Sequence, residues 1–518
     1  YQQRERLQKQ IMKRMKELGI NVCLPGYSGM VPHDAKERLG LDVADPGKWN
    51  DYKRPAFLQP TSKRFTEIAS IYYKEQQRLY GKADFYSMDP FHEGGNAGGV
   101  DLRKAGEAIM GAMKAVNPNA VWVVQAWGAC PYPAMIKHLK NGDMLVLDLY
   151  SENRPHWGDP ESTWYRKEGF NGHDWAFCML LNFGGNVGMF GKLQHVVDEY
   201  YKARCSSFNS TMKGVGLTME GIENNPVMYE LVSELPWRDA KFSWKEWLHD
   251  YVEARYGNIN NAKVHDAWLL LARSVYGAGA KIVEQGCHES VLCARPALDV
   301  YQVSSWSEME EFYNPDDVIR AARLMVEASH EVKSNANFRY DLVDVTRQAI
   351  AEQARYVYDE IVAAYKAKDR KMFDYTTKRF LDILLQQDRL LSSMPDFMVG
   401  GWIRSARNLG QNEQERNHYE WNARVQITTW GNRSAAEYGG LREYAHKEWN
   451  GVLADFYYPR WKAYFEALAA TLDGKPMKQL DFYAMDEKWT LQHNVYPYEA
   501  QGNPVEFAQT AFENVFGK

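Results

Sequence analysis

The first 240 residues contain six short runs of bulky apolar residues, separated by helical patterns or loops. Runs such as Val121-Trp122-Val123-Val124 and Leu145-Val146-Leu147 are continuously apolar rather than alternating. Strands covered on both faces of a parallel α/β sheet have this composition, whereas half-exposed strands alternate. The pattern therefore predicts repeated strand–helix units, with strands over 20–24, 84–89, 121–127, 144–150, 175–183 and 212–219.

Units of this kind close into a barrel of eight parallel strands. Because six strands are counted, we interpret residues 1–240 as a (β/α)8-type barrel domain that lacks its N-terminal strands. The chain begins at Tyr1, without a methionine and inside a predicted helix over 1–18. On this interpretation the chain is part of a longer protein. It is expected to aggregate or lack activity alone, because open sheet edges bind other strands.

The pattern changes after residue 240, where strand–helix alternation stops. Apolar residues now recur at helical spacing, as Ile350, Ala354, Val357 and Ile361 do. An all-α C-terminal domain is therefore predicted over 241–518. Its expected helices are 243–256, 262–275, 315–334, 342–367, 370–393, 412–430, 440–456 and 459–472.

Composition and spacing exclude several classes of function. The net charge is −5, so the chain lacks the basic surface of a nucleic-acid-binding protein. No run of 18 apolar residues exists that could span a membrane. The six cysteines form no C-x-x-C pair, and no histidine pair has metal-ligand spacing. No metal or cofactor is therefore expected.

Two glutamates follow predicted strand ends. Glu93 comes after strand 84–89 and Pro90, which stops strand pairing because proline has no N–H group. A glycine-rich loop follows, and it lacks the Lys-Ser/Thr pair of a phosphate-binding loop. Glu220 follows strand 212–219 in the same way. Each could instead be a solvated loop residue or a helix N-cap partner.

The strand count places these two carboxylates on opposite sides of the barrel mouth. The strand before Glu93 is the second counted and the strand before Glu220 is the sixth, four apart in a ring of eight. Two carboxylates that flank one bond are the requirement of glycoside hydrolysis. Asp89 and Asp148 precede their strand ends, so they either orient neighbours in the site or are buried hydrogen-bonding partners.

Several motifs together resemble one family, the α-N-acetylglucosaminidases of glycoside hydrolase family 89. The matching residues occur along most of the chain in the family's order and spacing. They are Leu24-Pro25 with Gly29 and Val31-Pro32; Asp89, Phe91 and Glu93; Val121-Trp122, Gln125 and Trp127; 145–149 with Glu152; 182–186 with Gly188 and Phe190-Gly191; 209–212 with Gly214 and Gly216; 220–222; and Thr429-Trp430-Gly431.

The resemblance implies a retaining mechanism, with Glu93 similar to the family's acid/base and Glu220 similar to its nucleophile. It also implies a pocket that takes aromatic side chains from both domains, here Trp127, Trp430 and Tyr444. Among the matched residues, Asp148, Glu152 and Asn182 are expected to bind substrate. His92 and Met30 depart from the pattern of some members.

The resemblance therefore implies an exo-glycosidase that releases terminal α-linked N-acetylglucosamine (GlcNAc) from heparan sulfate or mucin-type glycans. The expected partner is this carbohydrate, with a possible homo-oligomer, and a secretory route to the periplasm, cell exterior or lysosome is implied. Two alternatives stay open: an inactive barrel that binds GlcNAc-terminated glycans or serves as a scaffold, and a barrel glycosidase with another sugar specificity.

Overall fold

The computed structural model describes residues 1–91, 93, 95–97, 99–221, 224–282, 289–307 and 311–517. The chain divides into two compact units. Unit 1 comprises Tyr1–Leu180, Asp198–Thr218 and Val232–Asp239, and unit 2 comprises Leu181–Val197, Met219–Leu231 and Ala240–Lys518. Two segments from the first half of the chain, Leu181–Val197 and Met219–Leu231, thus belong to the unit that contains the C-terminal helices.

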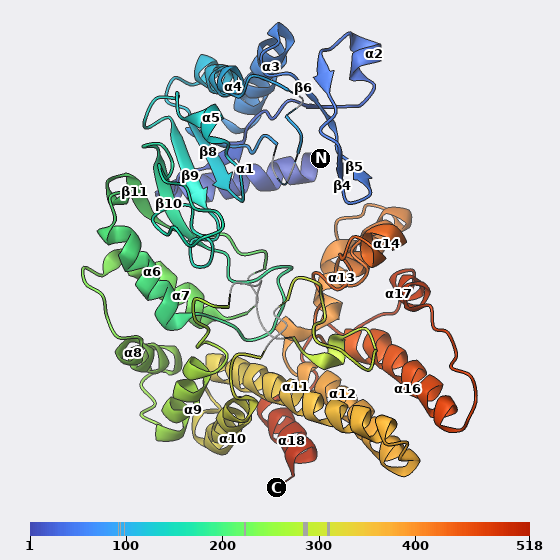
Figure 1. The fold of residues 1–518 in the computed structure, drawn as a ribbon. Helices are drawn as coiled ribbons and strands as arrows, with labels where there is room; N and C mark the ends of the chain where they lie inside the picture. Colours follow the sequence, from blue (N-terminus) through green and yellow to red (C-terminus); the bar gives the residue numbers. More distant parts are fainter. Residues whose placement is uncertain are drawn as a thin grey trace. The chain divides into compact units, whose positions relative to one another are not determined.

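Unit 1 is built on a six-stranded sheet in which every neighbouring pair is parallel (Figure 1). The strands follow one another in chain order, and β1 and β11 form its edges among the described residues. All six predicted strands are confirmed, as is the α/β fold class. The strands are β1 (Cys23–Pro25), β7 (Phe85–Ser87), β8 (Val121–Ala126), β9 (Met144–Asp148), β10 (Asp174–Met179) and β11 (Met212–Leu217).

Helices precede, separate or follow most of these strands, as the alternation of patterns predicted, while residues 149–173 between β9 and β10 contain no helix. The helix α3 begins at Ser62, whose hydroxyl accepts a hydrogen bond from the Phe65 N–H and so satisfies one free donor of the first turn. Asp101 caps α4 in the same way. The helices are α1 (Gln2–Glu17), α3 (Lys63–Tyr80), α4 (Leu102–Val116), α5 (Pro133–Ile136), α6 (Leu193–Cys205) and α7 (Pro226–Glu234), with 3₁₀ turns at Asn209–Thr211 and Leu235–Trp237.

Residues 33–59 are more ordered than their irregular sequence suggests. They contain the short helix α2 (Ala35–Leu39), a hairpin, and two of the three strands of a small antiparallel sheet. In this sheet, β6 (Ala56–Leu58) lies between β2 (Met30–Val31) and β3 (Val43–Ala44). The hairpin consists of β4 (Lys48–Trp49) and β5 (Tyr52–Lys53). Asn50 closes this hairpin with a φ of 48°, which a two-residue turn requires.

Unit 2 contains the predicted all-α region. Its central helix is α11, whose residues Leu342 to Ile350 are all buried, and α10, α12 and α18 pack against it. The helices are α8 (Trp244–Tyr256), α9 (Ala262–Arg273), α10 (Pro315–Val332), α11 (Ala336–Lys366), α12 (Arg370–Leu391), α13 (Val399–Arg407), α14 (Glu413–Gln426), α15 (Arg433–Glu437), α16 (Tyr458–Leu472), α17 (Phe482–Thr490) and α18 (Pro504–Phe516). Short 3₁₀ turns occur at Val291–Cys293 and Pro395–Phe397.

The helix predicted over 440–456 is wrong. Residues 438–450 are turns and irregular backbone, followed by a π-helical turn at Leu453–Tyr457 that runs directly into α16. Backbone groups of this segment form hydrogen bonds with residues outside it instead of the bonds of a helix. For example, the Glu443 N–H donates to the Thr428 carbonyl. Within the described ranges, no helix is both long and apolar enough to cross a membrane.

Candidate active site

The exposed carboxylate of Glu220 accepts two short hydrogen bonds in unit 2. The backbone N–H of Gly184 and the hydroxyl of Tyr444 both donate to Oε2, each at 2.7 Å. Among the residues that the structure describes, Oε1 receives no hydrogen bond. One oxygen of Glu220 is thus fixed by two donors while the other is available for chemistry.

The loop that supplies the first donor can only be built with glycine. Gly184 and Gly185 both have a φ of 63°, which disfavours residues with a Cβ atom. A Cβ on Gly184 would also lie 1.9 Å from the carbonyl oxygen of Tyr444. The buried amine of Lys447 donates to the carbonyls of Gly184 and Gly185. The loop and the segment around Tyr444 therefore hold each other in place.

Trp430 lies beside Tyr444, with ring centroids 5.2 Å apart and planes inclined by 54°. Its φ of 60° is unusual for a residue with a bulky side chain. Such backbone strain persists only where the surroundings enforce it, and it is concentrated at functional sites. The structure therefore brings Trp430, Tyr444 and Glu220 together, three residues that are up to 224 positions apart.

Asn182, which follows β10 by three residues, is buried in the same unit. Its amide donates to the Asn224 side chain at 3.2 Å and more weakly to the Asn186 carbonyl at 3.4 Å. Its side-chain oxygen has no partner within the described part of the chain. A buried amide oxygen of this kind can accept a hydrogen bond from a ligand.

In unit 1, the exposed Glu93 is held by two residues from the small hairpin region. The indole N–H of Trp49 donates to Glu93 Oε2 at 2.9 Å, and Arg54 Nη2 donates to the Glu93 carbonyl at 2.6 Å. The backbone of Glu93 has a φ of 52°, again in the left-handed region. Neighbouring residues His92 and Gly94 lie outside the described residues.

Asp89, four residues before Glu93, accepts a hydrogen bond from the Gln125 N–H at 2.6 Å. Burial raises the pKa of this carboxyl to about 6, although the Gln125 hydrogen bond opposes the shift. Asp89 lines a cavity of about 180 Å3 together with Arg54, Phe57 and Phe91. Asp89 is thus a hydrogen-bonding partner at the end of β7, and it also faces a cavity.

Trp127 and Asp148 are brought near each other through His156 and Trp164. His156 is buried, and both nitrogens of its ring have a hydrogen-bonding partner. Nδ1 lies 2.7 Å from Asp148 Oδ1, and Nε2 lies 2.9 Å from the carbonyl oxygen of Gly128. Trp164 contacts both His156 and the Trp127 ring, with centroids 5.4 and 4.7 Å apart. Asp148 is fully buried, so its contacts within the protein orient this aromatic wall.

Glu152 is also buried, and its Oε1 accepts a hydrogen bond from the Leu180 N–H at 2.9 Å. This contact lies at the exit of β10, directly before Leu181, whose φ is 67°. Glu152 thus helps to determine how the chain leaves the strand. A role of Asp148 and Glu152 in binding substrate stays a prediction.

Sequence reasoning did not identify Trp49, Arg54 or Lys447. The first two lie in a stretch without clear helix or strand periodicity, where the local turn signal is Asn50-Asp51, because both residue types are common in turns. Lys447 lies in the segment predicted as a helix. Its contacts with Gly184 and Gly185 join positions that are far apart in the sequence, and local patterns do not report such contacts.

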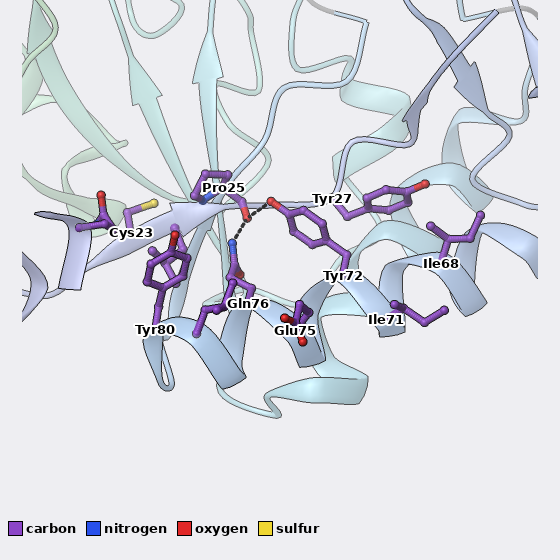
Figure 2. Close-up of a pocket in the computed structure, with 12 residues that line it drawn as sticks. Cys23, Pro25, Tyr27, Ile68, Ile71, Tyr72, Glu75, Gln76 and Tyr80 are labelled. Carbon is purple, nitrogen blue, oxygen red and sulfur yellow. Dashed lines mark hydrogen bonds between the residues drawn. The ribbon is translucent and has the colours of Figure 1, made fainter. Parts of the chain in front are cut away.

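A larger cavity of about 620 Å3 lies between β1 and α3 in unit 1 (Figure 2). Its walls are mostly apolar, and the Pro25 carbonyl accepts hydrogen bonds there from Tyr72 and Gln76. The acidic side chain on its lining, Glu75, forms an ion pair with Arg78 at the surface. Because Glu75 is the one carboxylate among the described residues that line it, this cavity is a poor candidate for acid–base chemistry.

Comparison with known families covers nearly the whole chain. Residues 1–239 match the α-N-acetylglucosaminidase (NAGLU) TIM-barrel domain, and residues 247–514 match the C-terminal domain of the same family. Human α-N-acetylglucosaminidase is 32% identical over 98% of this chain and 68% of its own length.

Solved structures give the same result. The family 89 glycoside hydrolase from Clostridium perfringens in complex with PUGNAc superposes with a TM-score of 0.92 and 32% identity over 99% of this chain. A variant of that protein in complex with its substrate GlcNAc-α-1,4-galactose superposes equally well. This chain spans 58% of the clostridial chain's length. The chain therefore belongs to the α-N-acetylglucosaminidase family, the glycoside hydrolases of family 89.

Proposed function

We propose that this protein is a retaining exo-glycosidase that removes terminal α-linked GlcNAc from glycans. The observation that carries the proposal is the environment of Glu220. Two donors converge on Oε2 and so orient the carboxylate. A carboxylate that is oriented in this way and follows a parallel strand has the position that a glycosidase nucleophile needs.

In the proposed first step, Glu220 attacks the anomeric carbon while Glu93 donates a proton to the leaving oxygen. In the second step, Glu93 removes a proton from the water that hydrolyses the glycosyl–Glu220 ester, so the α configuration is retained. Trp49 contacts Oε2 of Glu93, which leaves Oε1 as the proton-carrying atom. Retention predicts that the two carboxyl groups lie about 5–5.5 Å apart in the working enzyme.

The proposed substrate pocket draws on both parts of the sequence. We assign residues 1–240 to the catalytic barrel domain and residues 241–518 to the helical domain. The hydrogen bond from Tyr444 to Glu220 supports a contribution of the helical domain to the pocket. Trp127 and Trp430 offer ring faces for the sugar, and Asn182, Asp148 and Glu152 offer polar groups.

Two complexes of the clostridial relative support the sugar and the linkage. The clostridial protein has been captured with GlcNAc-α-1,4-galactose, in a variant with two glutamates changed to glutamine, and with 2-acetamido-1,2-dideoxynojirmycin. We propose the same terminal sugar for this chain, with heparan sulfate or mucin-type glycans as natural sources.

The test compares three aryl glycosides: α-GlcNAc, β-GlcNAc and α-glucoside. The proposal expects turnover of α-GlcNAc alone, with α-GlcNAc as the first product in a time-resolved NMR spectrum. Binding of α-GlcNAc without turnover would instead identify an inactive glycan-binding protein, and preference for another sugar would identify a barrel glycosidase of different specificity. A β-configured first product would mean an inverting mechanism.

A further inference from the structure

Two histidines and one glutamate gather on helices α8 and α9 of unit 2, apart from every residue assigned to glycoside hydrolysis. His249 and Glu253 are one helical turn apart on α8, so their side chains project from the same face. His265 reaches the same point from α9. Sequence spacing alone did not show a histidine pair, because the partner imidazole comes from the next helix.

The donor atoms of the three side chains all lie within 4.8 Å of one another. His265 Nε2 is 2.5 Å from Glu253 Oε1, and the two imidazole rings are stacked with centroids 4.6 Å apart. In a tetrahedral zinc site with bonds of about 2.0–2.1 Å, neighbouring ligand atoms are about 3.4 Å apart. The His265–Glu253 pair is closer than this, so binding an ion would require these two donor atoms to move apart by about 0.9 Å and would replace their direct hydrogen bond.

The three residues differ in exposure in a way that suits a surface site. His249 is exposed, whereas Glu253 and His265 are largely enclosed, with side chains 18% and 17% exposed. The enclosed pair lies where α8 packs on α9, whereas His249 is at the surface. Asp250 Oδ1 lies 3.7 Å from His249 Nδ1, and a carboxylate beside a histidine ligand favours cation binding.

We propose that His249, Glu253 and His265 bind a divalent transition-metal ion of the zinc class, which links α8 to α9. Two imidazole nitrogens and one carboxylate oxygen select such ions over Mg2+ or Ca2+, which prefer oxygen ligands. With three protein ligands, water completes the tetrahedron. The expected effect is structural, because the ion closes a hairpin whose helices meet through the short connection 257–261.

The test uses the full chain, freed of metal with EDTA, and Zn2+ as the probe. Isothermal titration is expected to show one high-affinity Zn2+ per chain. Zn2+ should also raise the Tm, reversibly with EDTA, whereas Mg2+ should not. The variant His249→Gln is expected to weaken Zn2+ binding by at least about tenfold and to abolish the Tm shift. Hydrolase activity of this variant should be unchanged.

His418→Gln is the matched control, since His418 is an exposed histidine on another helix of the same unit. It should bind Zn2+ as the parent does. Equal Zn2+ affinity in His249→Gln and the parent, or no Tm shift in the parent, would overturn the proposal and leave an ordinary His265–Glu253 ion pair. A second variant, Glu253→Gln, tests the enclosed ligand in the same titration.

Discussion

At the scale of single residues, the hydroxyl of Tyr444 has the most specific consequence. It is one of two donors to Glu220 Oε2, and the substitution Tyr444→Phe removes it without changing the ring beside Trp430. A hydrogen bond to a charged group contributes about 1.5–3 kcal/mol. We expect kcat on an aryl α-GlcNAc substrate to fall about 10- to 100-fold with little change in Tm. An unchanged kcat would show that Tyr444 does not support the nucleophile.

Asp89 gives a prediction about pH. Its pKa is about 6 in the folded protein, above the ordinary value of 3.8, because burial disfavours the charged form. Between these values the folded protein holds a proton that the unfolded chain has lost. The free energy of unfolding therefore falls as the pH rises from about 4 to 6. Above pH 6 it stays lower than at pH 4, by up to about 3 kcal/mol.

Asp89→Asn removes this ionisation but keeps an oxygen to accept the Gln125 N–H. We expect the variant to be more stable than the parent by about 1–3 kcal/mol at pH 7.5 and nearly unchanged at pH 4, in urea unfolding at both pH values. The exposed Asp51, changed to Asn, serves as the control. An equal gain at both pH values, or a loss at pH 7.5, would contradict the assignment.

At the scale of elements, the loop after β10 connects sequence to site most directly. Gly184→Ala places a Cβ against the Tyr444 carbonyl and forces alanine into a positive φ. We expect a loss of activity of at least about 100-fold, because the loop must move and the Gly184 N–H leaves Glu220. Enzyme kinetics and Tm measure the effect.

Gly111→Ala provides the contrasting substitution. Gly111 lies within α4, and a Cβ there meets nothing within 4 Å. Alanine should increase stability by about 0.5–1 kcal/mol and leave kcat unchanged. If both glycine variants show the same change in kcat and Tm, the short distance between Gly184 and the Tyr444 carbonyl is not the reason for glycine at this position.

Elements with strong local periodicity were predictable, and those defined by distant contacts were not. The strands of the sheet and helices such as α11 were found because burial on both faces, or on one helical face, leaves a clear pattern. The prediction of a helix over 440–456 is wrong because Lys447 donates hydrogen bonds to the 184–185 loop and the Tyr444 carbonyl packs closely against Gly184. The hairpin that carries Trp49 was missed because its strands contain two residues each.

At the scale of the whole molecule, several of the predicted site residues lie at or shortly after the ends of strands. Trp127 and Asp148 lie at the ends of β8 and β9, and Glu220 follows β11 by three residues. The order of the strands could be predicted from the sequence. The hydrogen bond from Tyr444 to Glu220 could not, because it joins residues that are 224 positions apart in the sequence. The order of the motifs in the sequence was sufficient to identify the family. The hydrogen-bond donors around each carboxylate could be identified only from the structure.

Arg347 joins the helical core to the loops of unit 2. It is buried, contacts Asp344 and Glu448, and donates to the Val187 carbonyl. Arg347→Met leaves two buried carboxylates uncompensated, so we expect a loss of about 3–5 kcal/mol in urea unfolding. Arg320→Met, at an exposed position of α10, should change stability by less than about 0.5 kcal/mol. Similar losses in both variants would argue against a buried ion network.

The central claim is that Glu220 forms the bond to the sugar while Glu93 transfers protons. The most direct measurement is peptide mapping by mass spectrometry of Glu93→Ala after incubation with an aryl α-GlcNAc that carries a good leaving group. Such a substrate needs little protonation to react, and the missing base slows hydrolysis of the ester. We predict one N-acetylglucosaminyl group on the peptide that contains Glu220, at its carboxylate. A sugar attached to another residue, or accumulation of the adduct in Glu220→Ala instead, would contradict the assignment.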